Sequence, residues 1–415
     1  MSKTIIIIGA GLAGLSAALQ AAENGCNVKL VSSLPSERAQ SVMAEGGINA
    51  ALNTKDENDS PEEHFTDTIK AACGLADPNA VWGMTQAAPE LVHWLLKLGV
   101  KFNMSGYDDV DLRNFGGQKK KRTAFAQSDT GKQIMTAMID AVRRKEASGM
   151  VERFSHHSFL TLRLCGNICC GCVIRDEYSQ ETVELPGDAV IVATGGMHGL
   201  FGNTTGSLSN TGEVTAELFR LGVPLANGEM IQYHPTTVKC GGKRILISEA
   251  ARGEGGRLFA MKDGKQWYFM EEKYPELGNL MPRDITAREI WKVSHESEVF
   301  LDMTEISKEV ISNKLSGLAD DCMTYLHKDI RKEPVPVFPG IHYFMGGILV
   351  DEQHRTSIQN LYAAGECCAQ YHGANRLGGN SLLGALYGGR VAAKSACEQA
   401  DGVVLSCAAQ IDIPP

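Results

Sequence analysis

Three glycines that follow a short apolar run constrain the fold of this chain more than any other feature. Residues 4–8 read TIIII, and Gly9, Gly11 and Gly14 follow in the pattern G-x-G-x-x-G. A continuous apolar run predicts a parallel strand that is buried on both faces. The first glycine permits a tight turn, the second lets the backbone approach a pyrophosphate, and the third lets the next helix pack on the strand. We therefore predict a strand, helix and strand over residues 4–33 that bind a dinucleotide at the helix N-terminus.

The end of the second predicted strand departs from the pattern of proteins that bind NAD. Those proteins often carry an acidic residue at this place, which binds the ribose hydroxyls. This sequence has Ser32 and Ser33 there instead. A serine hydroxyl can still bind a ribose, but the residue that usually selects NAD is missing.

Glycine-rich turns recur at distant points of the chain. The segment GDAVIVATGG at 187–196 reads as a buried strand stopped by glycines, and NLYAAG at 360–365 reads as another. The loop NRLGGNSLL then leads into a predicted helix, and AEGG occupies residues 44–47. The three strand-to-glycine turns indicate a single extended ligand, held by an α/β fold.

A change in composition divides the chain of 415 residues, which is too long for one ordinary core. Residues 61–100 and 130–148 are predicted to be helical. Residues 230–341 are richer in charge and loops, so we predict a second domain inserted into the first. The predicted fold is α/β, with a Rossmann-like domain over 1–229 and 342–415 and an α+β capping domain between these parts.

Composition argues against several classes of protein. The formal net charge of −9 disfavours a nucleic-acid binder, which needs a basic surface. The run QKKKR at 118–122 is interpreted as a solvated loop. No apolar run reaches about 18 residues, so we expect no transmembrane helix. Residues 1–19 hold glycines at turn spacing and a single lysine, so we expect no targeting signal.

The cysteines indicate neither a disulfide scaffold nor a metal cluster. Twelve cysteines in 415 residues are too sparse for such a scaffold, so we expect reduced thiols in a cytoplasmic protein. The segment TLRLCGNICCGCVIRD reads as a hairpin with Gly-Asn at its turn. Its spacing matches no usual zinc or iron–sulfur site, and the cysteines concerned are Cys165, Cys169, Cys170 and Cys172. Cys367 and Cys368 follow a strand and are expected to pack, so we predict no metal site.

Ionisable side chains lie beside several of the predicted glycine turns. Taken singly, each has an ordinary explanation, because His234 precedes a proline in a turn and Arg283 can start a helix. Their position at glycine-rich turns near the ends of the predicted insertion instead favours a functional site. The candidates are His234, Ser248, Glu249, Arg252, Arg283, His342 and Arg376.

A set of motifs runs in order over nearly the whole chain, namely GAGLAGLSAA, AEGGINAAL, NFGGQKKKRTAFAQSDTGKQI, VIVATGG, QYHPTT, SEAARGEGGRL, PRDITARE, HYFMGGI, NLYAAGE and HGANRLGGNSLL. In this order they resemble the flavoprotein subunit of succinate dehydrogenase and fumarate reductase, a family that also includes L-aspartate oxidase. The resemblance implies that the Rossmann-like domain binds FAD. The implied FAD-binding residues are Gly9, Gly11, Gly14, Ser32, Gly46, Gly47, Gly195, Glu366, Ser381 and Leu382.

The resemblance also bears on Gln40, which precedes the AEGG loop. Respiratory members of the family have a histidine here that bonds covalently to the flavin, whereas L-aspartate oxidase and soluble fumarate reductases lack this bond. Because glutamine cannot form it, we predict dissociable FAD, with the AEGG loop against the isoalloxazine. Loss of the covalent bond tilts the expected reaction towards reduction of fumarate or a relative.

The implied reaction transfers a hydride between flavin N5 and one carbon of a four-carbon dicarboxylate, with proton transfer at the neighbouring carbon. The family assigns carboxylate binding to the positions of His234, His342 and Arg376, which we expect to act as cations. Ser248 stands where the family usually has threonine, and its hydroxyl is expected to bind substrate. Phe115 matches an aromatic residue that packs near the substrate.

The resemblance assigns the proton donor to the position of Arg283. Glu249 and Arg252 would then form a relay to solvent. A guanidinium ordinarily keeps its proton in water, so this role needs a dry site with a carboxylate that returns the proton. The alternative is that Arg283 only binds substrate charge.

Two departures from the family pattern concern the cofactor domain. The chain reads NTGEV at 210–214 where the family commonly has T-G-D-G, which places Val214 near an FAD-binding turn. Respiratory members also continue into a helical C-terminal region, which we expect to be missing after residue 415.

Several functions are weighed against one another. We favour fumarate or succinate over aspartate, because Gln118 and the adjacent lysines offer no acid near the place where L-aspartate oxidase binds the substrate amine. A reductase of another enoate and an L-aspartate oxidase-like enzyme are the catalytic alternatives, and an FAD-binding scaffold is the non-catalytic one. No C-x₂-C-x₂-C motif occurs, so an iron–sulfur centre would belong to a partner subunit. Such a partner would place this cytoplasmic protein at the inner face of a membrane.

Overall fold

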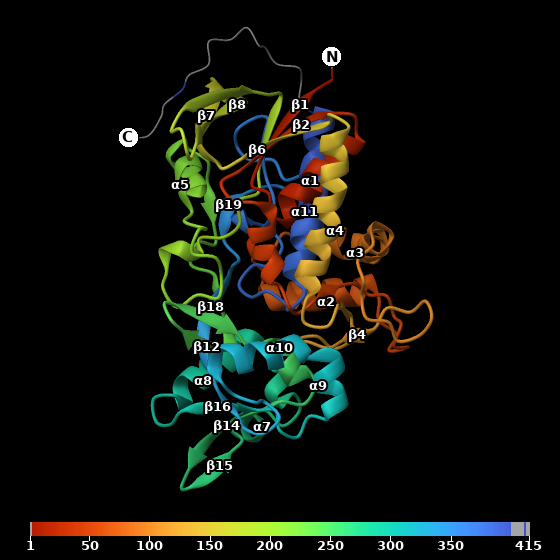
Figure 1. The fold of residues 1–415 in the computed structure, drawn as a ribbon, viewed down its shortest axis with the longest axis vertical. Coiled ribbons are helices and arrows are strands. Elements are labelled where there is room, and N and C mark those ends of the chain that lie inside the picture. The colour runs from red at the N-terminus through yellow and green to blue at the C-terminus, as the bar shows by residue number, and fades with distance from the viewer. Residues whose placement is uncertain (1, 400–410, 412–415) are drawn as a thin grey trace.

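A five-stranded parallel sheet forms the centre of the molecule, which a computed structural model describes over residues 2–399 and 411. Its strand order is β20-β10-β1-β2-β6, formed by β1 (Thr4–Ile8), β2 (Asn27–Ser32), β6 (Val151–Ser155), β10 (Ala189–Val192) and β20 (Leu361–Ala363). One face of this sheet is covered by α1 (Leu12–Glu23), α4 (Thr130–Ala147) and α11 (Asn380–Gln399), which share its apolar core (Figure 1). The predicted strand, helix and strand of residues 4–33 are confirmed.

A three-stranded antiparallel sheet covers the other face. It consists of β7 (His157–Cys165), β8 (Ile168–Asp176) and β9 (Thr182–Pro186), and its core includes Ile6 and Ile8 of the central sheet. The predicted hairpin is confirmed, since β7 pairs with β8 across a turn at Gly166 and Asn167. Its cysteine side chains at 169 and 172 are buried in this core.

Close backbone contacts explain two of the glycines in the first motif. Gly9 has φ +110°, and a Cβ atom there would lie 2.2 Å from the Ala193 carbonyl oxygen. A Cβ atom on Gly14 would lie 1.8 Å from the carbonyl oxygen of Gly9. Both distances are shorter than any real contact, so the turn and the packing of α1 on β1 require glycine.

The segment that precedes the AEGG loop forms two short 3₁₀ turns, η1 (Ser36–Arg38) and η2 (Gln40–Met43). Gly47 has φ +137°, and a Cβ atom there would lie 2.4 Å from the Ala124 carbonyl oxygen. A Cβ atom on Gly46 would lie 3.0 Å from the Phe115 ring. The paired glycines therefore fit the loop against a small sheet formed by β3 (Ile48–Asn49), β4 (Leu112–Arg113) and β5 (Thr123–Ala124).

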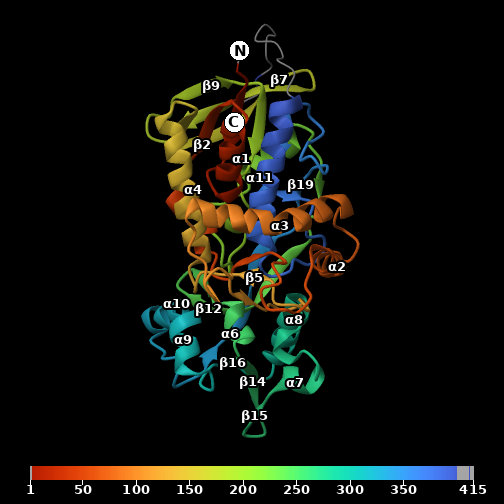
Figure 2. The same cartoon turned by 90° about the vertical axis from the view of Figure 1, so that its right-hand side faces the viewer.

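The helical segment predicted over residues 61–100 consists of two helices. They are α2 (Pro61–Ala72) and α3 (Pro78–Leu98), and Cys73 ends α2 in a left-handed conformation with φ 52°. Each helix begins with a side-chain cap followed by proline, because Ser60 accepts from the Glu63 N–H and Asp77 accepts from the Asn79 N–H. Figure 2 shows α3 lying across α4 and α11.

The interpretation of QKKKR as a solvated loop is wrong for both ends of that run. Gln118 and Arg122 are buried. Arg122 Nη2 lies 2.7 Å from Asp59 Oδ1, and Arg122 Nη1 lies 2.9 Å from Asp67 Oδ2. Both carboxylates come from an earlier stretch of chain, and burying the cation without them would cost several kcal/mol, on the order expected for an unpaired charge.

A second layer of structure, the cap, begins where β12 (Ile231–Cys240) pairs with β18 (Phe338–Phe344) and β13 (Lys243–Leu246). The chain between these strands forms a sheet of β14 (Arg257–Lys262), β15 (Lys265–Trp267), β16 (Val299–Asp302) and β17 (Val335–Pro336). Around it lie α6 (Glu249–Gly253), α7 (Phe269–Lys273), α8 (Arg283–Val293), α9 (Lys308–Lys314) and α10 (Ser316–Asp321). This cap has its own apolar core and occupies the lower part of Figure 1. The residue boundaries at 229 and 341 stay predictions. The third predicted segment covers residues 342–415, and its residues 400–410 and 412–415 lie outside the described residues.

The remaining elements connect these layers. A small sheet contains β11 (Leu225–Ala226), β19 (Gly347–Leu349) and β21 (Cys368–Ala369), and α5 (Glu213–Arg220) packs against β7. Short turns are η3 (His198–Leu200), η4 (Gly278–Leu280), η5 (Cys322–Leu326) and η6 (Gly365–Cys367). In the part of the chain that the structure describes, no helix is both long and apolar enough to span a bilayer.

Candidate active site

A long cavity of ≈ 310 Å³ extends from the first glycine turn to the cap. Its size falls within the range of about 300–1,000 Å³ that is usual for ligand sites. The predicted cofactor residues that line it are Gly9, Gly11, Ser32, Gly46, Gly47, Gly195, Glu366, Ser381 and Leu382. The predicted substrate and catalytic residues that line it are Phe115, His234, Ser248, Glu249, Arg283, His342 and Arg376. Gly14 and Arg252 lie behind the lining, Gly14 against the Gly9 carbonyl and Arg252 beside Glu249.

The end of the cavity near the parallel sheet fits a dinucleotide. Gly11 is the N-cap of α1 and lines the cavity together with Leu12, so the N-terminus of this helix, which favours an anion, lies at the cavity. Ser32, at the end of β2, and Ser158 of β7 line the cavity, and their buried hydroxyls have no hydrogen-bond partner among the described residues. A ribose hydroxyl would supply the partner that Ser32 lacks, because a buried hydroxyl without a hydrogen bond is unfavourable.

Glu366 holds a fixed position in the cavity wall. Its Oε1 accepts from the Phe344 N–H at 3.0 Å and lies 3.1 Å from His198 Nε2. Val214 lies in the first turn of α5 and also lines the cavity, so it is near the cofactor end as expected. Gln40 lines the same cavity from η2.

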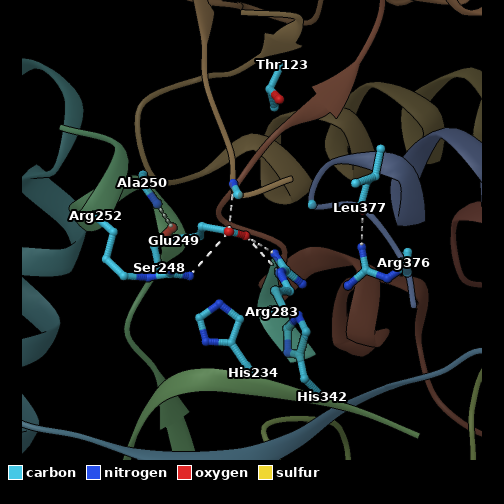
Figure 3. Close-up of polar contacts among 12 residues, drawn as sticks. Thr123, His234, Ser248, Glu249, Ala250, Arg252, Arg283, His342, Arg376 and Leu377 are labelled. Carbon is cyan, nitrogen blue, oxygen red and sulfur yellow. Dashed lines mark hydrogen bonds and ion pairs between the residues drawn. The ribbon is translucent and has the colours of Figure 1, made fainter. Parts of the chain in front are cut away.

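A buried carboxylate organises the substrate end of the cavity. Glu249 Oε2 accepts from Arg283 Nε at 2.8 Å, and its other oxygen accepts from the Gly116 N–H at 2.9 Å (Figure 3). Arg252 Nη2 lies 3.2 Å from Glu249 Oε1. Burial alone would raise the pKa of Glu249, but the charges of Arg283 and Arg252 lower it below its ordinary value. Glu249 is therefore an anion that holds two guanidinium groups.

The line of contacts from Arg283 through Glu249 to Arg252 is continuous, as the predicted relay requires. Arg252 Nη1 donates to the Asn279 carbonyl at 2.6 Å, and the Arg252 side chain is 0% exposed. Burial lowers the pKa of Arg252, although the Glu249 charge opposes this effect. This line of contacts therefore ends inside the protein at Arg252.

The sequence reasoning missed Gln232, which joins the two guanidinium groups that face the cavity. Its Oε1 accepts from Arg283 Nη1 at 3.1 Å and from Arg376 Nη2 at 3.0 Å. Gln232 lies two residues before His234 on β12, and both are buried while Tyr233 between them is exposed. Because residues two apart in a strand project to the same face, Gln232 lies on the same face of β12 as His234. The sequence pattern could therefore have identified Gln232 as a site residue.

Gln232 also connects the site to the contact between cap and parallel-sheet domain. Its Nε2 donates to Asn375 Oδ1 at 2.8 Å, and Asn375 Nδ2 donates to Asp284 Oδ1 at 2.9 Å. Asp284 follows Arg283 in the first turn of α8. Asn375 precedes Arg376 in the loop before α11. The Asn375 side chain thus links Gln232 to Asp284, and Asn375 and Asp284 are the sequence neighbours of Arg376 and Arg283.

The two predicted histidines lie together, with ring centroids of His234 and His342 5.1 Å apart. His342 Nδ1 lies 2.7 Å from the Thr205 hydroxyl, and His234 Nδ1 accepts from the Thr236 N–H at 3.2 Å. Burial, and then neighbouring positive charge, holds the pKa of both imidazoles well below the ordinary value. The expectation that they act as cations is therefore not met in this structure: they are neutral groups suited to hydrogen bonding.

Ser248 and Phe115 complete the substrate end. Ser248 caps α6, its hydroxyl accepting from the Ala250 N–H at 3.4 Å, so the residue before Glu249 is fixed in the wall. Phe115 is buried between two glycine loops, since Cβ atoms on Gly46 and Gly378 would lie 3.0 Å and 2.7 Å from its ring. The ring keeps this side of the cavity apolar.

Comparison with known proteins agrees with this geometry. The family model described as "FAD binding domain" matches residues 4–382. The succinate dehydrogenase flavoprotein subunit of Bacillus subtilis is 44% identical over 410 residues, which is 97% of this chain and 70% of that protein. The chain belongs to the succinate dehydrogenase and fumarate reductase flavoprotein family. It is an FAD-dependent oxidoreductase of the type that acts on CH–CH groups.

Two further relatives show the breadth of this flavoprotein family. A structure of mutated E. coli quinol fumarate reductase superposes with a TM-score of 0.89 at 31% identity, covering 96% of this chain and 70% of that one. L-aspartate oxidase of Streptomyces coelicolor is 34% identical over 97% of this chain and 70% of that protein. The flavoprotein described here therefore shares its fold with enzymes of different named activity, and its substrate must be argued from its own site.

Proposed function

We propose that this flavoprotein interconverts fumarate and succinate, with Arg283 as the proton donor. FAD, when bound, supplies the hydride acceptor and donor at its N5 atom. The observation that carries the proposal is the pairing of Arg283 with the buried Glu249 next to Arg376, since Gln232 accepts from both guanidinium groups. A dianionic substrate needs such a cationic, dry site, and a scaffold protein has no use for it.

Each side chain has a defined task in this proposal. Arg376 grips one carboxylate through its planar fork, and the neutral imidazoles of His234 and His342 donate hydrogen bonds. The Ser248 hydroxyl contacts the other carboxylate. Phe115 keeps water from the double bond. These contacts draw electron density onto the carboxylates, which favours addition at the double bond.

The proton moves at Arg283. One of its Nη atoms would give a proton to the substrate carbon, and Glu249, 2.6 Å from Nη2, offsets the charge and helps to return the proton. Arg252 lies on the far side of Glu249 and keeps this carboxylate ionised. Arg283 is buried beside a carboxylate, and such a setting is what a guanidinium needs in order to act as an acid.

The direct test is turnover with a chemical electron donor. Purified protein with FAD is expected to oxidise dithionite-reduced viologen when fumarate is added, and a panel of enoates should react more slowly. No turnover with fumarate, together with turnover on another acrylate, would favour a different enoate reductase. Oxidation of L-aspartate in preference to both would favour an L-aspartate oxidase-like enzyme.

FAD is expected to be held without a covalent bond, because Gln40 occupies the position that the resemblance assigns to the covalent histidine. Acid precipitation should leave a colourless pellet and a yellow supernatant whose flavin, measured by absorbance, is equimolar with protein. Flavin that remains in the washed pellet would contradict this expectation. Flavin released in this way would support fumarate reduction as the favoured direction.

Substrate affinity is expected to fall as the pH rises above about 9. Burial, reinforced by the charge of Arg283, lowers the pKa of Arg376 to about 9. Below that pH Arg376 is a cation that attracts the dianion, and above it this attraction is lost. KM for fumarate measured between pH 7 and 10 should rise by up to about tenfold per pH unit beyond the transition. A flat profile in the wild type would show that Arg376 keeps its proton throughout.

The proposed partner and location rest on the resemblance to the family rather than on a contact of this chain. We propose an iron–sulfur subunit as electron partner and a cytoplasmic position, peripheral to the inner face of a membrane. A relative from Wolinella succinogenes is named as the flavoprotein subunit of an 8-methylmenaquinol:fumarate reductase, which supports an assembly with other subunits. Co-purification of an iron–sulfur protein with the chain in its own cell would test this.

A further inference from the structure

Arg376 is an unusual cation because its contacts in the described part of the chain are all neutral. Its Nη2 donates to Gln232 Oε1 at 3.0 Å and its Nη1 donates to the Leu377 carbonyl at 3.2 Å. Its Nε is buried without a hydrogen-bond partner. By contrast, Arg283 and Arg252 each contact Glu249. Something other than a carboxylate must therefore hold the Arg376 guanidinium in place.

The aromatic ring of Tyr343 is that support. The Arg376 Cζ atom lies 4.2 Å from the centroid of the Tyr343 ring, within the distance of about 6 Å at which a cation and a ring face attract. Tyr343 is buried, so water does not weaken the attraction. The ring also blocks one face of the guanidinium, which limits rotation of the long side chain.

Tyr343 and Gln232 lie directly across from each other on neighbouring strands of one sheet. They are cross-strand partners in the antiparallel pair of β12 and β18. Directly opposite residues project to the same face of a sheet. The same pair thus supplies the ring on which Arg376 stacks and the amide oxygen that accepts from it. The remaining N–H groups, on Nε and on each terminal nitrogen, are left for a carboxylate.

Tyr343 is itself braced by His372. The two rings meet edge to face with centroids 5.4 Å apart and planes at 80°. His372 is buried and packs further against Tyr371 at 5.9 Å. The ring beneath Arg376 therefore belongs to a cluster of three packed aromatic side chains.

We propose that Tyr343 is a positioning residue, which orients Arg376 for the substrate carboxylate through its ring face and not through its hydroxyl. This inference deepens the proposed function and rests on it. Because the carboxylate is bound in both the ground state and the transition state, loss of the ring should weaken binding more than it slows the bound complex.

The experiment measures succinate binding to the FAD-loaded full chain by perturbation of the flavin absorbance. Tyr343→Phe keeps the ring and is expected to bind within about twofold of wild type. Tyr343→Leu removes the ring and is expected to raise Kd about tenfold, the size of a desolvated cation–π contact. In turnover, KM should rise by a similar factor while kcat changes by less than about threefold.

A fluorination series separates the electrostatic role from packing and does not depend on folding of the leucine variant. Phenylalanine with one, two or three ring fluorines at position 343 keeps the shape of the ring but withdraws negative charge from its face. Kd for succinate is expected to rise stepwise along the series. A constant Kd, or an equal loss in Tyr343→Phe and Tyr343→Leu, would overturn the inference alone. Failure of the wild type to bind succinate would overturn the proposed function as well.

Discussion

Replacing Arg283 by alanine is expected to lower kcat for fumarate reduction by about 10³- to 10⁴-fold, the upper range for loss of a general acid. FAD content should not change, since Arg283 lies at the substrate end of the cavity and contacts Glu249 and Gln232. In the proposed mechanism, the alanine variant lacks the group that gives a proton to the substrate carbon. Steady-state kinetics with reduced viologen, together with the flavin-to-protein ratio, measure both quantities.

Two further variants decide what Arg283 does. Arg288→Ala alters an exposed arginine on the same helix, whose side chain is 62% exposed, and should leave kcat and KM near wild type. Arg283→Lys keeps the positive charge but loses the planar fork. If only KM rises in the alanine variant and lysine restores KM, Arg283 binds substrate charge and is not the acid. Activity near wild type in Arg283→Ala would refute both roles.

The substitution Glu249→Gln is expected to lower kcat by about 10²- to 10³-fold and to destabilise the protein by about 3 kcal/mol. Removal of the carboxylate charge leaves Arg283 and Arg252 buried beside a neutral amide. The amide also brings N–H groups where the carboxylate accepted hydrogen bonds. Breaking a buried pair in this way is far more costly than losing an exposed one.

Urea unfolding of the flavin-loaded protein gives the stability difference, and its pH dependence gives the cause. Because the folded pKa of Glu249 is lowered below 4.5, its stabilising charge is fully present above that pH. The difference between wild type and Glu249→Gln should therefore shrink as the pH falls below about 4.5. Glu271→Gln, which breaks a partly exposed pair with Arg257, is the control and should cost less than about 1 kcal/mol. Equal losses in the two variants would contradict a special role for Glu249.

The cofactor end of the molecule was predictable from sequence because its constraints are local. Gly14 serves a helix–strand contact with the carbonyl of Gly9, five residues earlier in the chain, and the structure shows this contact. The apolar run of β1 and the amphipathic α4 likewise carry their own signals. Where the conformation of a residue depends on its near neighbours in the chain, the sequence pattern is enough to predict it.

The errors arise where the deciding partner is far along the chain. QKKKR looks solvated until Asp59 and Asp67 are seen to neutralise Arg122. His234 and His342 look like cations until burial and the nearby guanidinium groups are counted. Their charge depends on the dielectric and on the neighbours, which no short segment specifies. Gln232 was not predicted because a neutral amide in a strand indicates no function by itself. Its importance depends on Arg283 and Arg376, which are distant in the sequence and donate to it in the fold.

Asp284, Asn375 and Gln232 form a hydrogen-bonded bridge between the cap and the parallel-sheet domain. Arg283 belongs to the cap, and Arg376 belongs to the loop before α11. The hydrogen bonds of the Gln232 and Asn375 side-chain amides link these two parts of the structure. A movement of the cap that parted Asp284 from Asn375 would also separate Arg283, the proposed acid, from Arg376, the proposed carboxylate-binding residue. In the proposed mechanism, such a movement would release the product and disrupt the catalytic arrangement at the same time.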